Sequence, residues 1–312
     1  MKLSVTRFGK DNTGKWNELV NVAKNGLFLF NRSYMDYHKD RFIDHSLMIC
    51  KEEKLIAVLP ANEMENKIFS HAGLTFGGLI YSNELKANEA INIIEQIISY
   101  YCGLGFEELV YKAIPFIFCL YPCQEDLYAL FRQNAVLTRR DISSAIDLSH
   151  PLRISESKRQ AIDKCGKMGM QVNENNNFTQ YWQLLEIVLE KFGVKPVHTL
   201  EEINFLKKHF TNQIRLFEAR LEGELLAGVV IYDYGLVVHT QYMANSNKGR
   251  NMGALDFINN FLINTTFSNR AYFSFGISTE EGGKVLNEGL IQQKEMMGGR
   301  AVVNDFYKIQ LK

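Results

Sequence analysis

Three consecutive apolar segments in the second half of the chain decide the fold. They are RLFEARL at residues 215–221, LLAGVVIY at residues 225–232 and LVVHTQY at residues 236–242. Turn sequences separate them, EGE at residues 222–224 and DYG at residues 233–235. Short runs rich in β-branched and aromatic residues, bounded by turn residues, are typical of strands. The stretch therefore predicts a hairpin followed by a third strand.

The sequence on either side predicts a strand and helix succession. Residues 245–253 are polar and contain glycine, which predicts a loop, and residues 254–267 carry apolar residues at helical spacing. A strand at 271–275, a helix at 281–294 and a strand at 301–309 follow. Upstream, helices are expected at 155–168 and 178–192, and Thr199 with Glu202 forms a capping-box pattern that starts another helix.

The first half repeats this order of elements. We expect a helix at 15–24, a hairpin of 46–50 and 55–59, and a strand region at 68–80. A helix at 88–101, a strand at 108–113, a helix at 125–132 and a strand at 144–148 complete it. Such a succession predicts an α/β (α+β) protein with two mixed β-sheet domains joined by helices, residues 1–148 and 149–312.

Composition excludes several classes of protein. The 312 residues contain 35 Lys and Arg and 35 Asp and Glu, so the formal net charge is zero. Bulk electrostatic binding to nucleic acid is therefore not expected. The most apolar run, residues 113–123, is too short to span a bilayer, and the N-terminus lacks the apolar core of a signal peptide. We expect a cytoplasmic protein without membrane insertion.

The five cysteines predict neither a disulfide framework nor a metal site. Their number is odd and most lie in apolar surroundings, which favours buried reduced thiols. Cys119 and Cys123 are four residues apart, but no nearby His or Cys pair completes a zinc set. We expect no metal.

The order strand, strand, strand, polar loop, helix, strand, helix, strand resembles the GNAT acyltransferase fold. Its repetition resembles the two-domain branch that includes the Fem-type transferases. Four segments are similar to segments of bacterial sugar-nucleotide N-acyltransferases of this superfamily: SHAGLTFGGL at 70–79, KPVHTLEE at 195–202, FGISTE at 275–280, and LNEGL with QKE at 286–290 and 293–295. The resemblance covers nearly the whole chain, and the C-terminal segments are its most specific part.

The resemblance implies an acyl-CoA-dependent N-acyltransferase. The acceptor would be the primary amine of a nucleotide-linked amino deoxysugar, such as a dTDP-amino sugar, in the biosynthesis of a surface polysaccharide such as lipopolysaccharide. Fem-type enzymes instead use aminoacyl-tRNA, usually with a long helical arm that this chain lacks. The alternatives are such a transferase acting on a peptidoglycan precursor, or a GNAT-like binding subunit without catalysis.

The resemblance also implies a coenzyme A site in the second half. Backbone N–H groups where a loop enters a helix can cradle a pyrophosphate. The expected cofactor-binding residues are Lys248, Gly249, Arg250, Asn251 and Gly253. Leu255 departs from the family pattern, which has a small residue there. A surface turn with ordinary backbone glycines is the alternative.

Amide formation requires a neutral amine, a donor for the oxyanion and an acid for the departing thiolate. GNAT enzymes usually supply the oxyanion donor from the strand before the pyrophosphate loop, here residues 241–243. We expect Tyr242 to be the acid, and His71 or Glu125 to be the base. His45 and His198 are the other histidine candidates for the base. A core tyrosine, structural histidines and a carboxylate at a helix start are the alternatives.

Four residues are candidates for binding the sugar nucleotide: Asn287, Lys294, His198 and Arg159. Asn287 and Lys294 are seven residues apart and would share a helix face. They could bind sugar hydroxyls and the diphosphate, and Arg159 could contact phosphate. Solvated helix surfaces are the alternative for all of them. The sequence does not indicate an oligomeric state.

Overall fold

The computed structural model describes residues 3–311 and forms two compact units. Unit 1 contains the chain up to Asp141, Glu281–Lys284 and the chain from Val303. Unit 2 contains Ile142–Glu280 and Val285–Val302. The C-terminal strand therefore belongs largely to the unit that begins the chain, whereas the sequence assigned residues 149–312 to one domain. Two strands, β9 (Val136–Asp147) and β17 (Arg300–Gln310), have residues in both units.

The strands of unit 2 follow the order β10, β11, β12, β13, β14, β9. Their bounds are β10 Gln171–Asn175, β11 Ile214–Leu221, β12 Glu224–Asp233, β13 Val237–Asn245 and β14 Tyr272–Ile277. Neighbours are antiparallel except β13 and β14, which are parallel. Strand β12 is buried along its length after Glu224, as expected for an apolar run covered on both faces.

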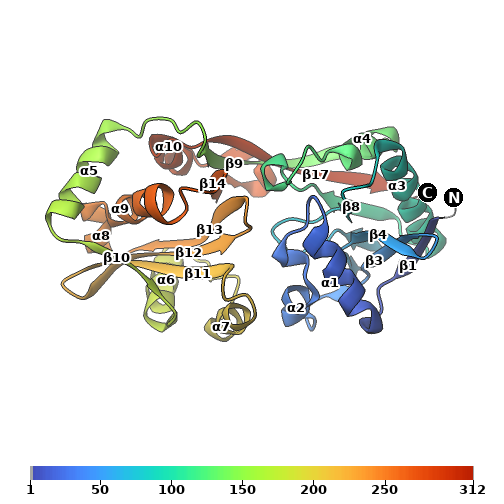
Figure 1. The fold of residues 1–312 in the computed structure, drawn as a ribbon, viewed down its shortest axis with the longest axis horizontal. Helices are drawn as coiled ribbons and strands as arrows, with labels where there is room; N and C mark the ends of the chain where they lie inside the picture. The colour runs from blue at the N-terminus through green and yellow to red at the C-terminus, as the bar shows by residue number, and fades with distance from the viewer. Residues whose placement is uncertain (1–2, 312) are drawn as a thin grey trace. The chain divides into compact units, whose positions relative to one another are not determined.

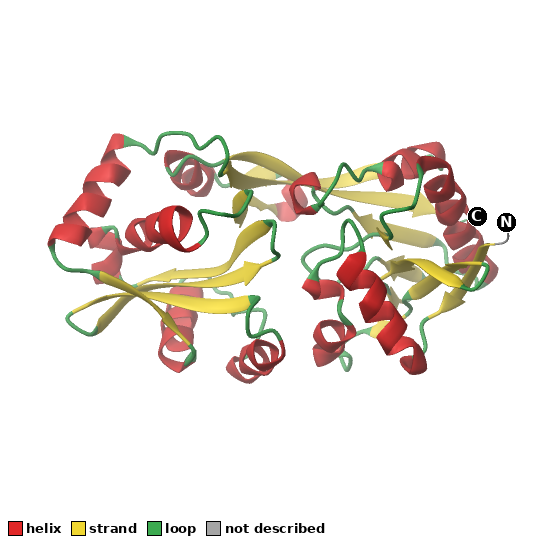
Figure 2. Ribbon diagram, viewed as in Figure 1, coloured by secondary structure: helices red, strands yellow, loops and turns green. Residues whose placement is uncertain are grey.

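Helices cover both faces of the unit 2 sheet (Figures 1 and 2). Helices α6 and α7 lie on one face, and α8 and α9 lie on the other, with α5 packed against α9. Their bounds are α5 Glu156–Lys167, α6 Thr179–Glu190, α7 Leu200–His209, α8 Asn247–Met252, α9 Ala254–Phe261 and α10 Glu288–Met296. A π-helical turn, Leu262–Thr266, extends α9. The core between α9 and the sheet includes Val229, Ile258 and Phe273.

Unit 1 has two groups of strands, in the orders β1-β3-β4-β7 and β17-β8-β6-β5-β2. Their bounds are β1 Leu3–Arg7, β2 Ile43–Asp44, β3 Leu47–Lys51, β4 Lys54–Leu59, β5 Asn62–Met64, β6 Lys67–Phe69, β7 Ile80–Tyr81 and β8 Glu108–Lys112. The helices are α1 Thr13–Val22, α2 Arg32–Met35, α3 Ala87–Gly103 and α4 Glu125–Arg132. The apolar face of α3 packs Ile93, Ile94 and Ile97 into the core.

The predicted mixed α+β architecture is confirmed. Helix α4 has the predicted bounds, and the capping box of Thr199 and Glu202 is formed. The predicted loop at 245–253 is wrong, because Ser246 caps helix α8 there. The predicted helix at 281–294 begins later, at Glu288, after a hairpin of β15 (Thr279–Glu280) and β16 (Val285–Leu286).

Gly228 in β12 provides a test of the packing between α6 and the sheet. A Cβ atom on Gly228 would lie 2.3 Å from Cδ2 of the Tyr181 ring. We expect Gly228→Ala to lower the free energy of unfolding by about 1–3 kcal/mol, because overpacking forces the buried ring to move. Urea denaturation measures the change.

Gly289→Ala is the matched control, since a Cβ there would meet only Asn287 Oδ1 at 3.9 Å. Gly289 lies in α10, where alanine is the better helix former, so this variant should be at least as stable as wild type. Equal stability of the Gly228→Ala variant and wild type would contradict the packing described.

Candidate functional site

Strands β13 and β14 separate partway along unit 2. Within residues 3–311 their backbone pairing covers only Val237–His239. Beyond that point β13 continues along β12 to Asn245, whereas β14 continues along β9 to Ile277. One edge of β13 from Thr240 onward is therefore not paired with β14. Backbone groups on an open strand edge can bind an extended ligand.

A β-bulge at Gln241 marks the point of separation. Tyr242 pairs with Val230 and Thr240 pairs with Ile231, so Gln241 is the extra residue on β13. Near this strand, three buried side-chain amide oxygens lack a hydrogen-bond partner in the described part of the chain. They belong to Gln241, Asn245 and Asn259. Buried acceptors of this kind are satisfied when a ligand brings N–H or O–H donors.

Helix α8 occupies the place of the predicted pyrophosphate loop. Its Gly249 N–H already donates to Ser246 Oγ, at 2.9 Å. A Cβ on Gly249 would lie 2.2 Å from Leu226 O, and a Cβ on Gly253 2.8 Å from the Cβ of Ala161. Both glycines thus have a packing reason to be glycine, and Gly253 also has a φ of 84°.

The polar residues of α8 lie at the surface. Lys248 is ion-paired with Glu224 at 2.5 Å. Arg250 and Asn251 are exposed. Of the five predicted cofactor residues, these last two are the ones to which the structure gives no packing or ion-pair role. The predicted backbone cradle is therefore not formed by a glycine-rich loop.

Tyr242 and His198 are the predicted site residues that the structure brings into direct contact. The Tyr242 hydroxyl lies 2.6 Å from His198 Nδ1 and accepts the His198 backbone N–H at 3.3 Å. Trp182 packs edge-on against Tyr242, with ring centroids 5.3 Å apart. Burial raises the pKa of Tyr242 to about 12, so the phenol is protonated at neutral pH. The loop between α6 and α7 thus places His198 next to the Tyr242 hydroxyl of β13.

Glu125, at the start of α4 in unit 1, is engaged in an ion pair. Lys24 Nζ lies 2.6 Å from Glu125, and Tyr81 donates a hydrogen bond to it at 2.9 Å. Its partial burial raises the pKa, but the hydrogen bonds from Lys24 and Tyr81 lower it on balance. A carboxylate with a lowered pKa is a weak base near neutrality.

The neighbouring Asp126 is buried, and its pKa is shifted in the opposite direction to that of Glu125. Tyr111 donates to Asp126 at 2.6 Å, and the Leu127 N–H donates at 2.9 Å. Burial nevertheless raises the pKa of Asp126 to about 6. The sequence analysis did not single out this residue, because nothing in its spacing distinguishes it from an ordinary helix-start carboxylate.

His71 is buried and held in an uncommon backbone conformation. Its φ is 67°, and it is 3% exposed. Burial, aided by the nearby His38, lowers the pKa of His71 to about 3. The imidazole is therefore neutral at physiological pH, and its basicity is too low to suit a general base. His45, considered with it, pairs with Glu63 at 2.5 Å and is also buried.

Asn287 and Lys294 hold the turn that follows β14. Lys294 Nζ donates to Gly276 O at 2.9 Å, to Ile277 O at 2.7 Å and to Ser278 Oγ at 2.8 Å. These bonds use all three donors and leave none for the predicted diphosphate contact. Asn287 is the N-cap of α10 and accepts from the Leu290 N–H. Arg159 is exposed and pairs with Glu156, which matches the alternative of a solvated face.

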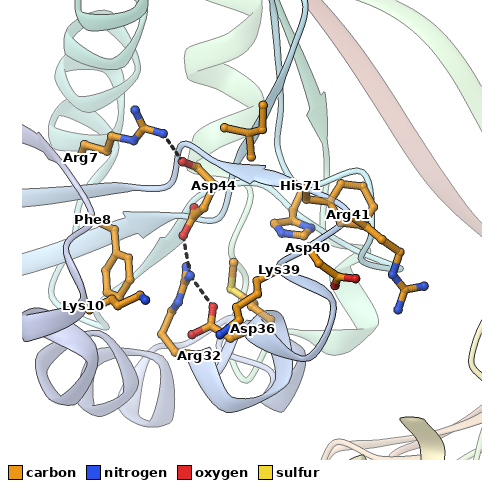
Figure 3. Close-up of a pocket in the computed structure, with 13 residues that line it drawn as sticks. Arg7, Phe8, Lys10, Arg32, Asp36, Lys39, Asp40, Arg41, Asp44 and His71 are labelled. Atoms are coloured by element: carbon orange, nitrogen blue, oxygen red, sulfur yellow. Dashed lines mark hydrogen bonds and ion pairs between the residues drawn. The ribbon is translucent and has the colours of Figure 1, made fainter. Parts of the chain in front are cut away.

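Unit 1 contains a charged cavity that the sequence analysis missed (Figure 3). Its volume is about 570 Å³, and most of its lining residues come from the region around α2 and β2. Cations and carboxylates alternate around it, with His71 at its inner wall. The charged lining residues are Arg7, Lys10, Arg32, Asp36, Lys39, Asp40, Arg41 and Asp44. The run of charges at residues 36–44 was the available signal, but its residues look like a solvated loop in sequence.

Neither a metal-holding cluster nor a membrane-spanning helix occurs among the described residues. In the described residues, no group of three or more His, Cys, Asp or Glu side chains is arranged to hold a metal ion. Likewise, none of the helices formed by residues 3–311 has the length and apolarity that crossing a membrane requires.

Comparison with known proteins shows the fold. No protein-family profile and no curated protein matches the chain. Among solved structures, FemX has a TM-score of 0.69 at 10% identity over 97% of this chain and 96% of its own. L-PGS from Bacillus licheniformis has 0.63 at 10% identity, covering 96% and 91%. A tandem GNAT protein from the clavulanic acid biosynthesis pathway has 0.54 at 7% identity, covering 100% and 99%. The chain has a two-domain GNAT-like fold.

The raised pKa of Asp126 makes a prediction about stability and pH. The folded-state pKa is about 6, whereas 3.8 is the usual value, so the folded protein binds this proton more tightly than the unfolded chain does. The resulting stabilisation is fully present below pH 3.8 and is lost as the pH rises through 6. This difference between the folded and unfolded pKa corresponds to about 3 kcal/mol in the free energy of unfolding.

We therefore expect Asp126→Asn to flatten the fall in the free energy of unfolding between pH 4 and pH 7, as measured by urea denaturation at each pH. Asparagine cannot titrate, and the carboxylate shape is retained. Parallel profiles for wild type and variant over this range would show that Asp126 has an ordinary pKa.

Proposed function

We propose that the protein transfers an acyl group from a coenzyme A thioester to the primary amine of a nucleotide-linked amino sugar. The open edge of β13 beyond His239 carries this proposal. The pantetheine arm of coenzyme A is extended and contains amide groups, so it can lie along that edge as an additional strand. The orphan amide oxygens of Gln241 and Asn259 would accept hydrogen bonds from its N–H groups.

The proposed chemistry needs few groups from the protein. The neutral amine attacks the thioester carbon, a C–N bond forms, and the carbonyl oxygen becomes an oxyanion. Backbone N–H groups near Gln241 at the bulge are the candidate donors for that oxyanion. Collapse breaks the C–S bond, and the thiolate takes a proton while the amine loses one.

Tyr242 and His198 are suited to the proton transfers. A protonated tyrosine beside the open edge can give its proton to the thiolate. His198 Nδ1, 2.6 Å from the hydroxyl, can return a proton to it. His71 and Glu125 stay predictions for the base, although the low pKa of His71 and the ion pair of Glu125 count against both.

A Fem-type transfer from aminoacyl-tRNA is the second candidate. Two observations favour it, the likeness to FemX and the replacement of the expected pyrophosphate loop by α8. The zero net charge counts against it, because tRNA binding depends on clustered cations. A subunit without catalysis is the third, and Leu255, which packs against the unit 2 core, fits that alternative.

A thiol-release assay tests the proposal directly. Purified protein is incubated with acyl-CoA and a panel of nucleotide-linked 3-amino and 4-amino sugars, and free thiol and acylated sugar are measured. Parallel reactions with aminoacyl-tRNA, with and without ribonuclease, separate the second candidate. Absence of coenzyme A binding in calorimetry would rule out the first.

Arg250 is the exposed cation of α8 in the predicted cofactor segment. We expect Arg250→Ala to weaken the coenzyme A complex by about tenfold through loss of one phosphate contact. Lys164, an exposed lysine in α5, supplies the control variant Lys164→Ala, which should bind as wild type does. Equal affinities of all three proteins would place the cofactor elsewhere.

For the reaction itself, we expect Tyr242→Phe to lower kcat by about 10²–10⁴ with little change in KM, since a general acid acts in the transition state. Tyr181→Phe is the matched control. Tyr181 is buried in α6, and its hydroxyl has no hydrogen-bond partner in the part of the chain that the structure describes. If Tyr242→Phe and Tyr181→Phe had the same kcat, Tyr242 would be a core residue only.

A further inference from the structure

The cavity of unit 1 has the charge and size of a ligand site. Five cations and three carboxylates line its volume of about 570 Å³, which is in the range of small-molecule pockets. Arg32 is buried and binds both Asp36 at 2.6 Å and Asp44 at 2.5 Å, so these two carboxylates share one cation and the other four cations face only Asp40. Lys10 and Lys39 are exposed at the rim. The remaining excess of positive charge favours an anion.

Two buried polar atoms at this cavity lack a hydrogen-bond partner among residues 3–311. They are Nδ1 of His71, which is 3% exposed, and Nε of Arg32, which is 4% exposed. Each unsatisfied buried polar atom costs about 1–3 kcal/mol. Both residues line the cavity, as Figure 3 shows. A ligand in the cavity could satisfy these atoms.

Hydrogen bonds within the protein hold the backbone of residues 71–74, which forms the cavity wall at His71. Lys112 Nζ donates to His71 O at 3.0 Å, to Ala72 O at 3.2 Å and to Leu74 O at 2.7 Å. Asn62 accepts the Ala72 N–H at 2.7 Å. These bonds hold the left-handed backbone of His71, which is costly for a residue with a side chain. Strain retained at a cavity wall is typical of ligand sites.

The cavity also has an aromatic and apolar part. Phe8 and Phe42 are half-buried, and both line it together with Met35 and Ile43. The Arg32 guanidinium stacks over the Phe8 ring at 4.1 Å. A ligand that carries both an anionic group and a planar ring would use both parts. Inorganic phosphate would use only the cations.

We propose that this cavity binds the nucleoside diphosphate part of the acceptor, with the phosphates near Lys10 and Lys39 and the base against Phe42. In this proposal His71 contributes a hydrogen bond to the ligand through Nδ1 and acts as a binding residue. This inference rests on the proposed function, because the acceptor named there contains a nucleoside diphosphate.

Calorimetry on the full chain tests the site without any turnover. The titrants are dTDP, UDP, inorganic phosphate and uncharged thymidine. We expect saturable binding of at least one nucleoside diphosphate, at least tenfold tighter than binding of phosphate or thymidine. The double variant Lys10→Ala and Lys39→Ala should weaken nucleotide binding at least tenfold, because it removes two phosphate contacts.

His71→Gly separates a ligand contact from a fold defect. Glycine adopts a φ of 67° without strain, so the wall should form, while the hydrogen bond to the ligand is lost. We expect about tenfold weaker nucleotide binding. Loss of the buried ring lowers the melting temperature, so binding is measured at a temperature at which the variant is fully folded. Lys54→Ala is the control, since Lys54 is exposed, pairs with Glu84 and does not line this cavity.

Three results would overturn the inference: no saturable nucleotide binding, affinities for dTDP and UDP that both equal that for phosphate, or wild-type affinity in the double variant. The outcome is separable from that of the proposed function. Acyl transfer to a nucleotide-linked sugar with unchanged KM in the double variant would overturn this site alone. Nucleotide binding at the cavity without any acyl transfer would overturn the proposed function alone.

Discussion

The early end of the pairing between β13 and β14 is the constraint on which the rest of unit 2 depends. Parallel pairing stops at His239, and the bulge at Gln241 turns the following residues of β13 away from β14. The backbone groups on that edge then have no neighbouring strand to satisfy them. The fold tolerates this because β13 and β14 each retain a second partner, β12 and β9 respectively. An open edge inside a sheet is a natural place for an extended ligand.

Each unit fixes a loop with a lysine, half-buried in the case of Lys112 and buried in the case of Lys294. Lys112 binds three carbonyl oxygens of residues 71–74, and Lys294 binds two carbonyls and a hydroxyl of residues 276–278. Burial lowers the pKa of both lysines to about 8. Three short bonds to oxygen offset much of the cost of burying the ammonium group. Both loops are therefore rigid walls, and both coincide with segments that carry the family resemblance.

Local patterns predicted elements well where the local interactions themselves determine the structure. The apolar face of α3 and the Thr199 cap needed no knowledge of distant residues. The prediction of a loop at 245–253 was wrong because a polar segment with glycine is typical of a loop, whereas Gly249 lies within α8 and allows the helix to approach Leu226 O. A close contact of this kind depends on a strand more than 20 residues away, and composition cannot reveal it.

The sequence by itself determined the mixed α+β architecture and longer elements such as α3, α4 and β12, since hydrophobic spacing and turn residues encode these locally. It also gave Tyr242 and His198 as candidate site residues, but separately. Only the tertiary structure brought the Tyr242 hydroxyl to 2.6 Å from His198 Nδ1. It also showed that Lys294 donates hydrogen bonds to backbone carbonyls. It alone gathered the cations of residues 7–41 around His71. The physical reason is that burial and side-chain pairing arise from residues far apart in the chain, which packing brings together.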